Sequence, residues 1–239
     1  MDKQEVFDLI KRVLIDNNIE PSEDIFTKLD IYYNFLIEYN KSVNLTALTT
    51  FEDVYVKHFA DCIAFSNIYK HGASLCDIGT GAGFPGIIIK IIRPDIKVTL
   101  VDSLNKRIVF LEALINKLAL NDIYCLHYRA EDLEFKNKFL NKFDYVVARA
   151  VAAMPTLTEY CLPYVKTGGQ FIAYKSNDID IECNSAKKCI NILGGKLFEI
   201  MNYKLTDEIN RSAIVINKTT KTDFKYPRGL NKPRLNPII

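Results

Sequence analysis

The stretch Leu75-Cys76-Asp77-Ile78-Gly79-Thr80-Gly81-Ala82-Gly83-Phe84-Pro85-Gly86 decides the fold of this chain. The apolar run over 74–78 predicts a buried strand, and the glycines after it predict a tight turn. Pro85 suits the start of a helix, which we expect to continue over 86–92 until Arg93-Pro94 ends it. A strand, a glycine turn and a helix start together expose backbone N–H groups and let a ligand approach the main chain closely.

The glycine spacing distinguishes this turn from the common dinucleotide-binding motif. That motif is G-x-G-x-x-G with an acidic residue about 20 positions later. Here Gly79, Gly81 and Gly83 form G-x-G-x-G, and Asp77 precedes the first glycine by two residues. Asp102 closes the next apolar run, 97–101, where an acid can accept two hydrogen bonds from ribose hydroxyls. The order of strand, turn, helix, strand and terminal acid resembles the class I S-adenosylmethionine-dependent methyltransferases.

The composition is that of an ordinary soluble protein. Of 239 residues, 49% are hydrophobic and 25% charged, and no apolar run reaches the length of about 20 residues that spans a bilayer. The first residues show no secretory signal. The six cysteines lack C-x-x-C spacing, so we expect buried free thiols in a reducing cytosol rather than disulfides or a metal site.

The basic residues gather at the end of the chain. From Asn217 onward there are six basic residues and one acid, so this segment carries about +5 and the rest about −3. Such a tail predicts a polyanionic partner such as RNA, with Tyr226-Pro227-Arg228 acting as a structural clasp as the alternative. We therefore expect a helical extension over 1–70, a Rossmann-like domain over 71–218 and a basic tail over 219–239.

Helices and strands are expected to alternate after the turn. The patterns predict strands at 97–102, 123–127, 143–148 and 170–174, helices at about 105–118, 154–165 and 182–193, and two last strands near 197–205 and 213–217. Before the turn, Asp2, Ser22 and Thr50 are candidate N-caps; the second helix would carry Phe26, Leu29, Tyr33, Leu36 and Ile37. The repeated β-α order predicts an α/β fold with a doubly wound, seven-stranded, mostly parallel sheet, in which the β-β ending adds one antiparallel strand.

The candidate site residues stand where the parallel strands end. Ligands of open parallel sheets bind outside the carboxyl ends of the strands. The candidates there are Asp77, Gly79, Gly81, Asp102, Ser103, Ala130, Glu131 and Arg149. An acid-rich rim suits a ligand with an amino group, ribose hydroxyls and a sulfonium charge better than one with a pyrophosphate. The alternative, that polar residues merely end strands in solvent, stays open for Ser103 and Asp132.

The residues at the end of the fourth strand indicate which kind of base methylation is possible. Methylation of exocyclic amino groups commonly uses a D/N-P-P-Y type motif there, and C5-pyrimidine methylation needs a cysteine nucleophile. The segment 149–154, Arg-Ala-Val-Ala-Ala-Met, offers neither. A ring nitrogen such as guanine N7 needs neither, because its lone pair is free in the neutral base and no proton has to be removed. Catalysis can then rest on positioning and electrostatics.

Several motifs, in order along nearly the whole chain, resemble the RsmG family, formerly called glucose-inhibited division protein B. They are Asn44-Leu45-Thr46, Lys57-His58-Phe59-Ala60-Asp61, the glycine turn through Phe84-Pro85-Gly86, Val101-Asp102-Ser103, Arg129-Ala130-Glu131, Ala148-Arg149-Ala150 and Tyr226-Pro227-Arg228. The resemblance implies a methyltransferase that uses S-adenosylmethionine to methylate N7 of a guanine in 16S ribosomal RNA. It also implies that Gly79, Phe84, Ala130, Glu131 and Arg149 contact the cofactor, and it makes a monomeric cytoplasmic protein the expectation.

The sequence departs from the family pattern at a few positions and leaves two other functions open. Cys62 stands where the family usually has serine, and Ser176 follows Lys175 where a glycine is usual. His58, in the spacing H-x-x-D with Asp61, is either a hydrogen-bonded structural group or a functional one. A small-molecule methyltransferase and a non-catalytic RNA- or nucleotide-binding module are the alternative functions.

Overall fold

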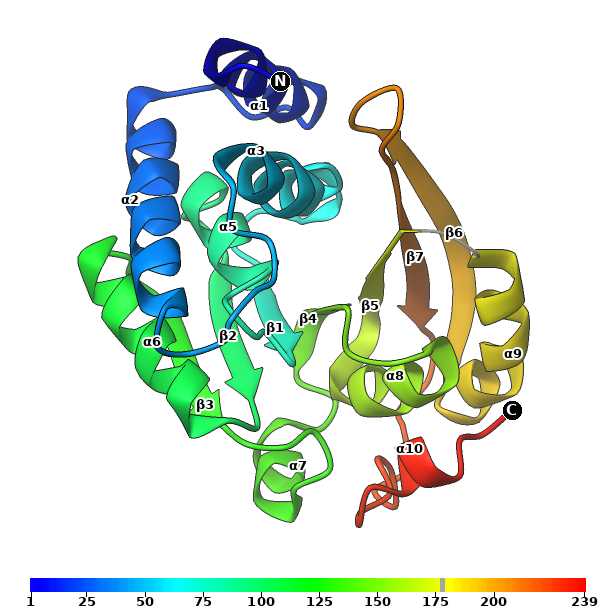
Figure 1. Ribbon diagram of the computed structural model, residues 1–239. Coiled ribbons are helices and arrows are strands. Elements are labelled where there is room, and N and C mark those ends of the chain that lie inside the picture. Colours follow the sequence, from blue (N-terminus) through cyan, green and yellow to red (C-terminus); the bar gives the residue numbers. More distant parts are fainter. Residues whose placement is uncertain (177–178) are drawn as a thin grey trace.

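The glycine turn follows an inner strand of one mixed sheet (Figure 1). In this computed structural model, which describes residues 1–176 and 179–239, seven strands are hydrogen-bonded in the order β3-β2-β1-β4-β5-β7-β6. Their bounds are β1 Ser74–Ile78, β2 Lys97–Asp102, β3 Ile123–His127, β4 Phe143–Arg149, β5 Val165–Lys175, β6 Gly195–Lys204 and β7 Asn210–Lys218. Among these strands β7 alone runs opposite to the other six, so the predicted doubly wound, mostly parallel sheet is confirmed.

Helices cover both faces of the sheet. Because side chains alternate along a strand, Leu75 packs in one apolar core and Cys76 in the other. The first core includes helices α1 (Lys3–Asp16), α2 (Glu23–Asn40), α5 (Gly86–Ile92) and α6 (Asn105–Lys117). The second includes α7 (Leu133–Phe139), α8 (Met154–Cys161) and α9 (Ile179–Ile192). The shorter elements are α3 (Phe51–Val54), α4 (Asp61–Ile63), α10 (Lys232–Leu235), the π-helical turn η1 (Tyr55–Ala60) and the 3-10 turns η2 (Ser66–Ile68) and η3 (Leu162–Tyr164).

The N-terminal helices begin at their predicted caps. Asp2 and Glu5 form a capping box, and the Ser22 hydroxyl accepts a hydrogen bond from the Ile25 N–H. On α2 the predicted Leu29 and Leu36 are buried, but the buried tyrosine is Tyr32, and the predicted Tyr33 is only half-buried. Figure 1 shows α2 lying beside α5 and α6, and α2 contacts both helices. The extension therefore packs directly on the helices that flank the glycine turn.

Two local expectations were wrong. Helix α7, between β3 and β4, was not predicted, and its first-turn residues follow Asp132 without a side-chain cap. The helix expected to run to residue 165 ends at Cys161, and the strand expected from residue 170 begins at Val165, so that β5 includes Gly168 and Gly169. A Cβ on Gly169 would come 2.4 Å from the Asp144 carbonyl oxygen, so glycine here allows β5 to approach β4 closely.

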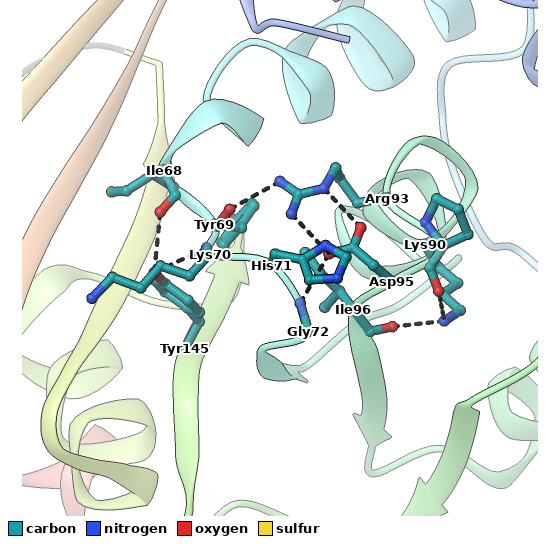
Figure 2. A network of polar contacts seen from close by, with 11 residues as sticks. Ile68, Tyr69, Lys70, His71, Gly72, Lys90, Arg93, Asp95, Ile96 and Tyr145 are labelled. Carbon is teal, nitrogen blue, oxygen red and sulfur yellow. Dashed lines mark hydrogen bonds and ion pairs between the residues drawn. The ribbon is translucent and has the colours of Figure 1, made fainter.

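A polar network holds the end of β1 opposite the glycine turn (Figure 2). The Asp95 carboxylate accepts two hydrogen bonds from Arg93 and one from the Gly72 N–H, all at 2.9–3.0 Å. Arg93 also donates to the Tyr69 carbonyl, and the Arg93 guanidinium lowers the pKa of Asp95 to about 2. This network fixes the loop that enters β1, so the strand presents its far end, and the turn, in one place.

The sequence composition predicted neither a membrane-spanning segment nor disulfides. Within the described residues, no helix is both long and apolar enough to cross a bilayer. Five of the six cysteines are buried, and none of the six forms a disulfide in the part of the chain described. The cysteine side chains therefore lie mostly in the core.

Candidate functional site

Two cavities lie side by side at the carboxyl ends of the strands. The first, which we call the turn cavity, has a volume of about 280 Å³ and is bordered by Gly79, Asp102 and Glu131. The second, which we call the arginine cavity, has a volume of about 400 Å³ and is bordered by His58, Arg149 and Arg211. The residues after β4 separate them, since Ala150 lines the arginine cavity whereas Val151 and Ala152 line the turn cavity.

The structure divides the nine candidate residues into three groups. Gly79, Asp102, Ser103, Ala130 and Glu131 line the turn cavity. Asp77 lies in β1 and Gly81 in the turn that follows it, and neither residue lines the turn cavity. Phe84 and Arg149 lie on the other side: the Arg149 guanidinium stacks 5.0 Å from the centre of the Phe84 ring. The side chain of Phe84 is buried against Tyr32 and His58 and lines neither cavity.

Backbone conformation explains the glycines of the turn. Gly79, Gly81 and Gly83 all have positive φ, between +62° and +100°, a region that other residues seldom adopt. At Gly79 a Cβ would also come 2.7 Å from a methyl group of Val151, so the loop after β4 can approach the turn only because the side chain is absent. The missing side chains therefore let the turn and the loop after β4 lie close together at the edge of the turn cavity.

Asp77 fixes the turn from inside the protein. Its Oδ2 accepts hydrogen bonds from the Thr80 hydroxyl at 2.7 Å and from the Gly86 N–H at 2.8 Å, which joins β1 to the start of α5. Its Oδ1 is buried and has no hydrogen-bond partner among the described residues. Burial raises the pKa of the Asp77 carboxyl to about 7, even though the two donors act in the opposite direction.

We expect Asp77→Asn to make the protein more stable at alkaline pH. A folded-state pKa raised above 3.8 means that burying the carboxylate costs free energy, and this cost grows as the pH rises from about 4 to 7. Asparagine retains an acceptor for Thr80 and Gly86 and carries no charge, but its amide N–H groups add an unpaired donor. The net gain should be about 1–2 kcal/mol at pH 8 and near zero at pH 4.

Urea denaturation of wild type and Asp77→Asn at both pH values measures this difference. Thr80→Val is the matched control, because it removes one donor to the same oxygen and leaves the charge in place. A variant less stable than wild type at pH 8 would contradict a buried charge at Asp77.

Both carboxylate oxygens of Asp102 accept hydrogen bonds from other residues of the protein. Its Oδ2 accepts from the Gly81 N–H at 2.9 Å and pairs with Arg107 at 3.1 Å, and its Oδ1 accepts from the Leu104 N–H at 2.9 Å. The carboxylate thus ties the glycine turn to the end of β2 and to α6. Arg107 was not anticipated, because an arginine in the first turn of a helix gives no sequence signal of its partner.

Two buried tyrosines hold the backbone around the cavity. The Tyr32 hydroxyl from α2 donates to the Ala82 carbonyl in the glycine turn, and the Tyr164 hydroxyl donates to the Ala130 carbonyl. Tyr32 also stacks on Phe84, with ring centres 5.3 Å apart. A Cβ on Gly83 would come 2.8 Å from the Tyr32 hydroxyl, so this glycine is needed for the contact. The N-terminal extension therefore supports the turn directly.

Arg149 sits at the centre of a hydrogen-bond network beside the arginine cavity. Its Nη1 donates to the Lys57 carbonyl at 3.1 Å and to Asp61 at 2.8 Å, and its Nη2 donates to His58 Nδ1 at 2.8 Å. Since a guanidinium only donates, His58 Nδ1 must be the acceptor and Nε2 must carry the proton, which it donates to the Thr46 hydroxyl at 2.9 Å. Burial and the Arg149 charge lower the pKa of His58 to about 3.

His58 and Asp61, the two residues of the H-x-x-D spacing, therefore both accept hydrogen bonds from Arg149. His58 stacks on Phe84 with ring centres 4.5 Å apart. The backbone around His58 also contributes to this network. His58 lies in the π-helical turn η1, a kind of irregularity that is common at functional sites. The Lys57 carbonyl of this turn accepts from Arg149.

The C-terminal tail folds back onto α8, as Figure 1 shows for α10. Arg228 donates to the fully buried Glu159 from its backbone N, its Nε and its Nη2, at 2.7–2.9 Å. The Thr156 hydroxyl donates to the Pro233 carbonyl, and the Tyr160 hydroxyl donates to Asn231 at 3.1 Å. These contacts agree with the alternative given for Tyr226-Pro227-Arg228, a structural clasp, since the Arg228 guanidinium pairs with the buried Glu159. Lys225, Lys232 and Arg234 remain exposed.

The residues of the turn cavity that were not anticipated come from three places. They are Ile78, Val101, Tyr128, Arg129, Val151, Ala152, Tyr160, Asn231 and Arg234. The first few adjoin residues that were predicted, so the strand ends could have indicated them. Asn231 and Arg234 reach the cavity only because the tail folds back over α8, where Tyr160 meets it, and no local pattern shows that return.

Comparison with known proteins gives a consistent family and fold. The family model described as GidB, rRNA small subunit methyltransferase G, matches residues 25–210. The ribosomal RNA small subunit methyltransferase G of Lactobacillus acidophilus is 45% identical over 94% of this chain and 96% of its own, and that of Lachnoclostridium phytofermentans is 48% identical over 89% of each.

Solved structures that are only distantly related in sequence share the fold. M. jannaschii TYW2 in complex with AdoMet superposes with a TM-score of 0.52 at 14% identity, over 67% of this chain and 76% of that one. A mutant of the 16S rRNA (adenine(1408)-N(1))-methyltransferase from Catenulisporales acidiphilia gives a TM-score of 0.52 at 11% identity, over 64% and 88%. At these identities the likeness concerns the arrangement of helices and strands alone.

Proposed function

Because the chain belongs to the GidB family of rRNA small subunit methyltransferases G, we propose that this methyltransferase modifies N7 of a guanine in 16S ribosomal RNA. S-adenosylmethionine is the proposed methyl donor, and it would supply a methyl group activated by its sulfonium charge. The observation that carries the proposal is the turn cavity, in which a glycine turn of positive φ meets the carboxylates of Asp102 and Glu131.

The residues of the turn cavity fit this cofactor. Its volume of about 280 Å³ is near the lower end of the range for small-molecule sites. Ile78, Val101 and Val151 give apolar walls for a purine ring, and Asp102 and Glu131 give acceptors for hydroxyl groups. In its ionised form the Asp77 carboxylate, with its unpartnered Oδ1, would add negative charge beside the turn that favours a cationic ligand.

We assign the cofactor contacts accordingly. Gly79, Gly81, Ser103 and Ala130 would act through the backbone around the cavity, and Asp102 and Glu131 through their carboxylates. Asp77 and Phe84 would act by fixing the turn, and Arg149 would act from the side of the arginine cavity. These assignments require no metal and no general base.

In the proposed reaction the protein has to position the guanine and the methyl donor, and it does not have to transfer a proton. Guanine N7 has a free lone pair, so the attack on a methyl group needs alignment and a suitable field, not deprotonation. The only histidine beside the cavities within the described residues, His58, is held neutral with its Nδ1 occupied by Arg149. The site thus contains the groups for positioning and lacks a free histidine base.

The substrate side is proposed to involve the exposed basic residues of the tail. Lys225, Lys232 and Arg234 are exposed, and Arg234 and the exposed Arg129 border the turn cavity, where an RNA would have to approach. Acting on ribosomal RNA, the protein is proposed to work in the cytoplasm as a monomer. Cells that lack the protein should lose one 7-methylguanosine from 16S ribosomal RNA, and unchanged nucleoside content would refute the proposed function.

We expect the triple variant Lys225→Gln, Lys232→Gln, Arg234→Gln to bind 16S ribosomal RNA more weakly at unchanged stability. Each removed cation that had neutralised a phosphate should flatten the slope of log affinity against log salt by about 0.7–0.9. Filter binding between roughly 50 and 200 mM salt, a range over which such effects are large, measures the slope. Lys11→Gln with Lys188→Gln, both exposed and remote from the tail in sequence, is the charge-removal control. An unaltered slope in the triple variant would exclude the tail as an RNA-binding segment.

A further inference from the structure

The C-terminal tail forms part of the wall of the turn cavity. Two residues that border this cavity, Asn231 and Arg234, come from the tail, and the others come from 78–160. Asn231 is half-buried, whereas Arg234 is exposed. Tyr160 of α8 also lines the cavity, and its hydroxyl donates to Asn231 Oδ1 at 3.1 Å. The tail therefore closes one side of a cavity whose other walls belong to the Rossmann-like domain.

Arg228 holds this part of the tail as a closed loop. Its backbone N–H and its side chain donate to the buried Glu159, and its Nη2 also donates to the Asn236 carbonyl at 2.8 Å. Between these two points, the Pro233 carbonyl accepts a hydrogen bond from α8 at 2.8 Å. One guanidinium thus joins both ends of 228–236, and α8 supports the middle. The loop therefore has a defined position beside the cavity.

The backbone of this loop turns at two consecutive residues of positive φ, Leu230 at +60° and Asn231 at +57°. Asparagine is one of the few residues besides glycine that adopt this conformation readily, whereas a leucine adopts it at a cost in free energy. The Leu230 side chain is 86% exposed, so its burial does not offset that cost. The contacts of Arg228 and Asn231 with α8 therefore hold the turn, which places Asn231 at the cavity.

The Asn231 carboxamide keeps hydrogen-bonding capacity for a ligand. Tyr160 occupies one lone pair of Oδ1, and a second lone pair remains. Among the described residues, Nδ2 donates to none, and it is not one of the buried polar atoms without a partner, so it is accessible. A carboxamide with a free donor and a free acceptor matches the edge of adenine that presents the 6-amino group beside a ring nitrogen, and asparagine recognises adenine in this way in nucleic acids.

The part of the cavity beside Asn231 is the part that follows β3. Burial together with the nearby Glu131 charge raises the pKa of Tyr160 to about 12, which places the Tyr160 hydroxyl close to the loop after that strand. In the sheet order β3-β2-β1, Asp102 ends β2 and the glycine turn follows β1. A cofactor with its sulfonium at the turn and its ribose at Asp102 would extend its base toward the loop after β3, and thus toward Asn231.

We propose that Asn231 is a specificity-determining residue that contacts the adenine base of the cofactor through its carboxamide, and that Tyr160 is the positioning residue that orients this carboxamide. The inference rests on the proposed function for the identity of the cofactor. It adds the C-terminal tail to the cofactor site. The same short loop then carries a base contact and the exposed cations Lys232 and Arg234, which are proposed to bind RNA.

Asn231→Gly tests the base contact, because glycine accepts a φ of +57° and removes only the carboxamide. Calorimetry compares S-adenosylhomocysteine with S-inosylhomocysteine, in which an oxo group replaces the 6-amino group. Wild type should prefer the adenosyl ligand, and the ratio of the two affinities should fall about tenfold in Asn231→Gly, as expected for the loss of one or two hydrogen bonds. Asn18→Gly is the matched control, since Asn18 has a φ of +59°, is exposed and lines neither cavity.

The two ligands separate contact with the base from closure of the cavity. If Asn231→Gly weakens both ligands by the same factor, the tail closes the cavity without recognising the base, and the proposal is overturned. Affinities equal to those of Asn18→Gly would overturn it as well. Wild type that binds neither ligand would instead refute the proposed cofactor, and this inference with it.

Tyr160→Phe tests the positioning role, because it removes the hydroxyl and keeps the ring in the cavity wall. The ratio of the two affinities should fall about threefold, which is less than in Asn231→Gly, since the carboxamide remains but is no longer held. Tyr203→Phe is the control: Tyr203 also loses a hydroxyl that donates to a side chain, Asp16, but it lines neither cavity. Thermal unfolding shows that each variant is folded at the assay temperature. An unchanged ratio in folded Tyr160→Phe would refute its role.

Discussion

Arg228→Ala is expected to lower the free energy of unfolding by about 3 kcal/mol, because it leaves the Glu159 carboxylate buried without its cation. Glu159 has no exposed surface, and Arg228 supplies two side-chain hydrogen bonds to it, at 2.8 Å and 2.7 Å. For a chain of this length the change corresponds to a fall of about 6–12 °C in Tm. Thermal and urea unfolding of the two proteins measure it.

The controls separate the clasp from a general effect of the tail. Lys232→Ala also removes a tail cation, but Lys232 is exposed, so its Tm should stay within about 2 °C of wild type. Glu159→Gln combined with Arg228→Ala should recover part of the lost stability, since no buried charge remains. A Tm of Arg228→Ala equal to that of wild type would mean that the contact with Glu159 contributes nothing to folding.

Gly81→Val should weaken S-adenosylhomocysteine binding at least about 100-fold while the protein still folds. A branched residue at φ +62° costs about 1–2 kcal/mol locally. Relief of that strain would move the Gly81 N–H away from Asp102, to which it donates at 2.9 Å, and with it the wall of the turn cavity. Losing about two ligand-facing hydrogen bonds corresponds to this change in affinity.

Gly168→Val is the matched control for this prediction. Gly168 has φ +85° and, like Gly81, no neighbour that a Cβ would touch closely, but it lies in β5 away from the turn cavity. Both variants should lose similar stability, and only Gly81→Val should lose ligand affinity in calorimetry. Equal affinities in the two variants would show that the glycine turn is not the cofactor site.

Local patterns in the sequence predicted the sheet well. The runs 74–78 and 97–102 coincide with β1 and β2, because the buried positions of inner strands covered on both faces are mostly apolar. The β-β ending predicted the antiparallel β7 for a simple reason: two strands joined by five residues leave no room for a crossover helix. The positions of Asp77, Asp102 and Arg149 at strand ends follow from the same boundaries.

Contacts between distant segments could not be predicted. Tyr32 lies 50 residues before Ala82, yet its hydroxyl supports the glycine turn. In the sequence, Arg228 is indistinguishable from the other cations of the basic tail. Its pairing with Glu159 follows from the fold, in which the tail returns over α8. His58 and Arg149 are separated by 91 residues. In each case the residue type indicates a capacity for a contact, and the tertiary fold selects the partner.

The most direct test of the proposed activity uses the purified protein with small ribosomal subunits from cells that lack it. The subunits are incubated with S-adenosylmethionine carrying an isotopically labelled methyl group, and the 16S ribosomal RNA is digested to nucleosides and examined by mass spectrometry. We predict that the label appears in 7-methylguanosine, and that Gly81→Val gives far less of it than Gly168→Val. Label in another nucleoside, or no label in an otherwise active preparation that binds S-adenosylhomocysteine, would contradict methylation of guanine N7.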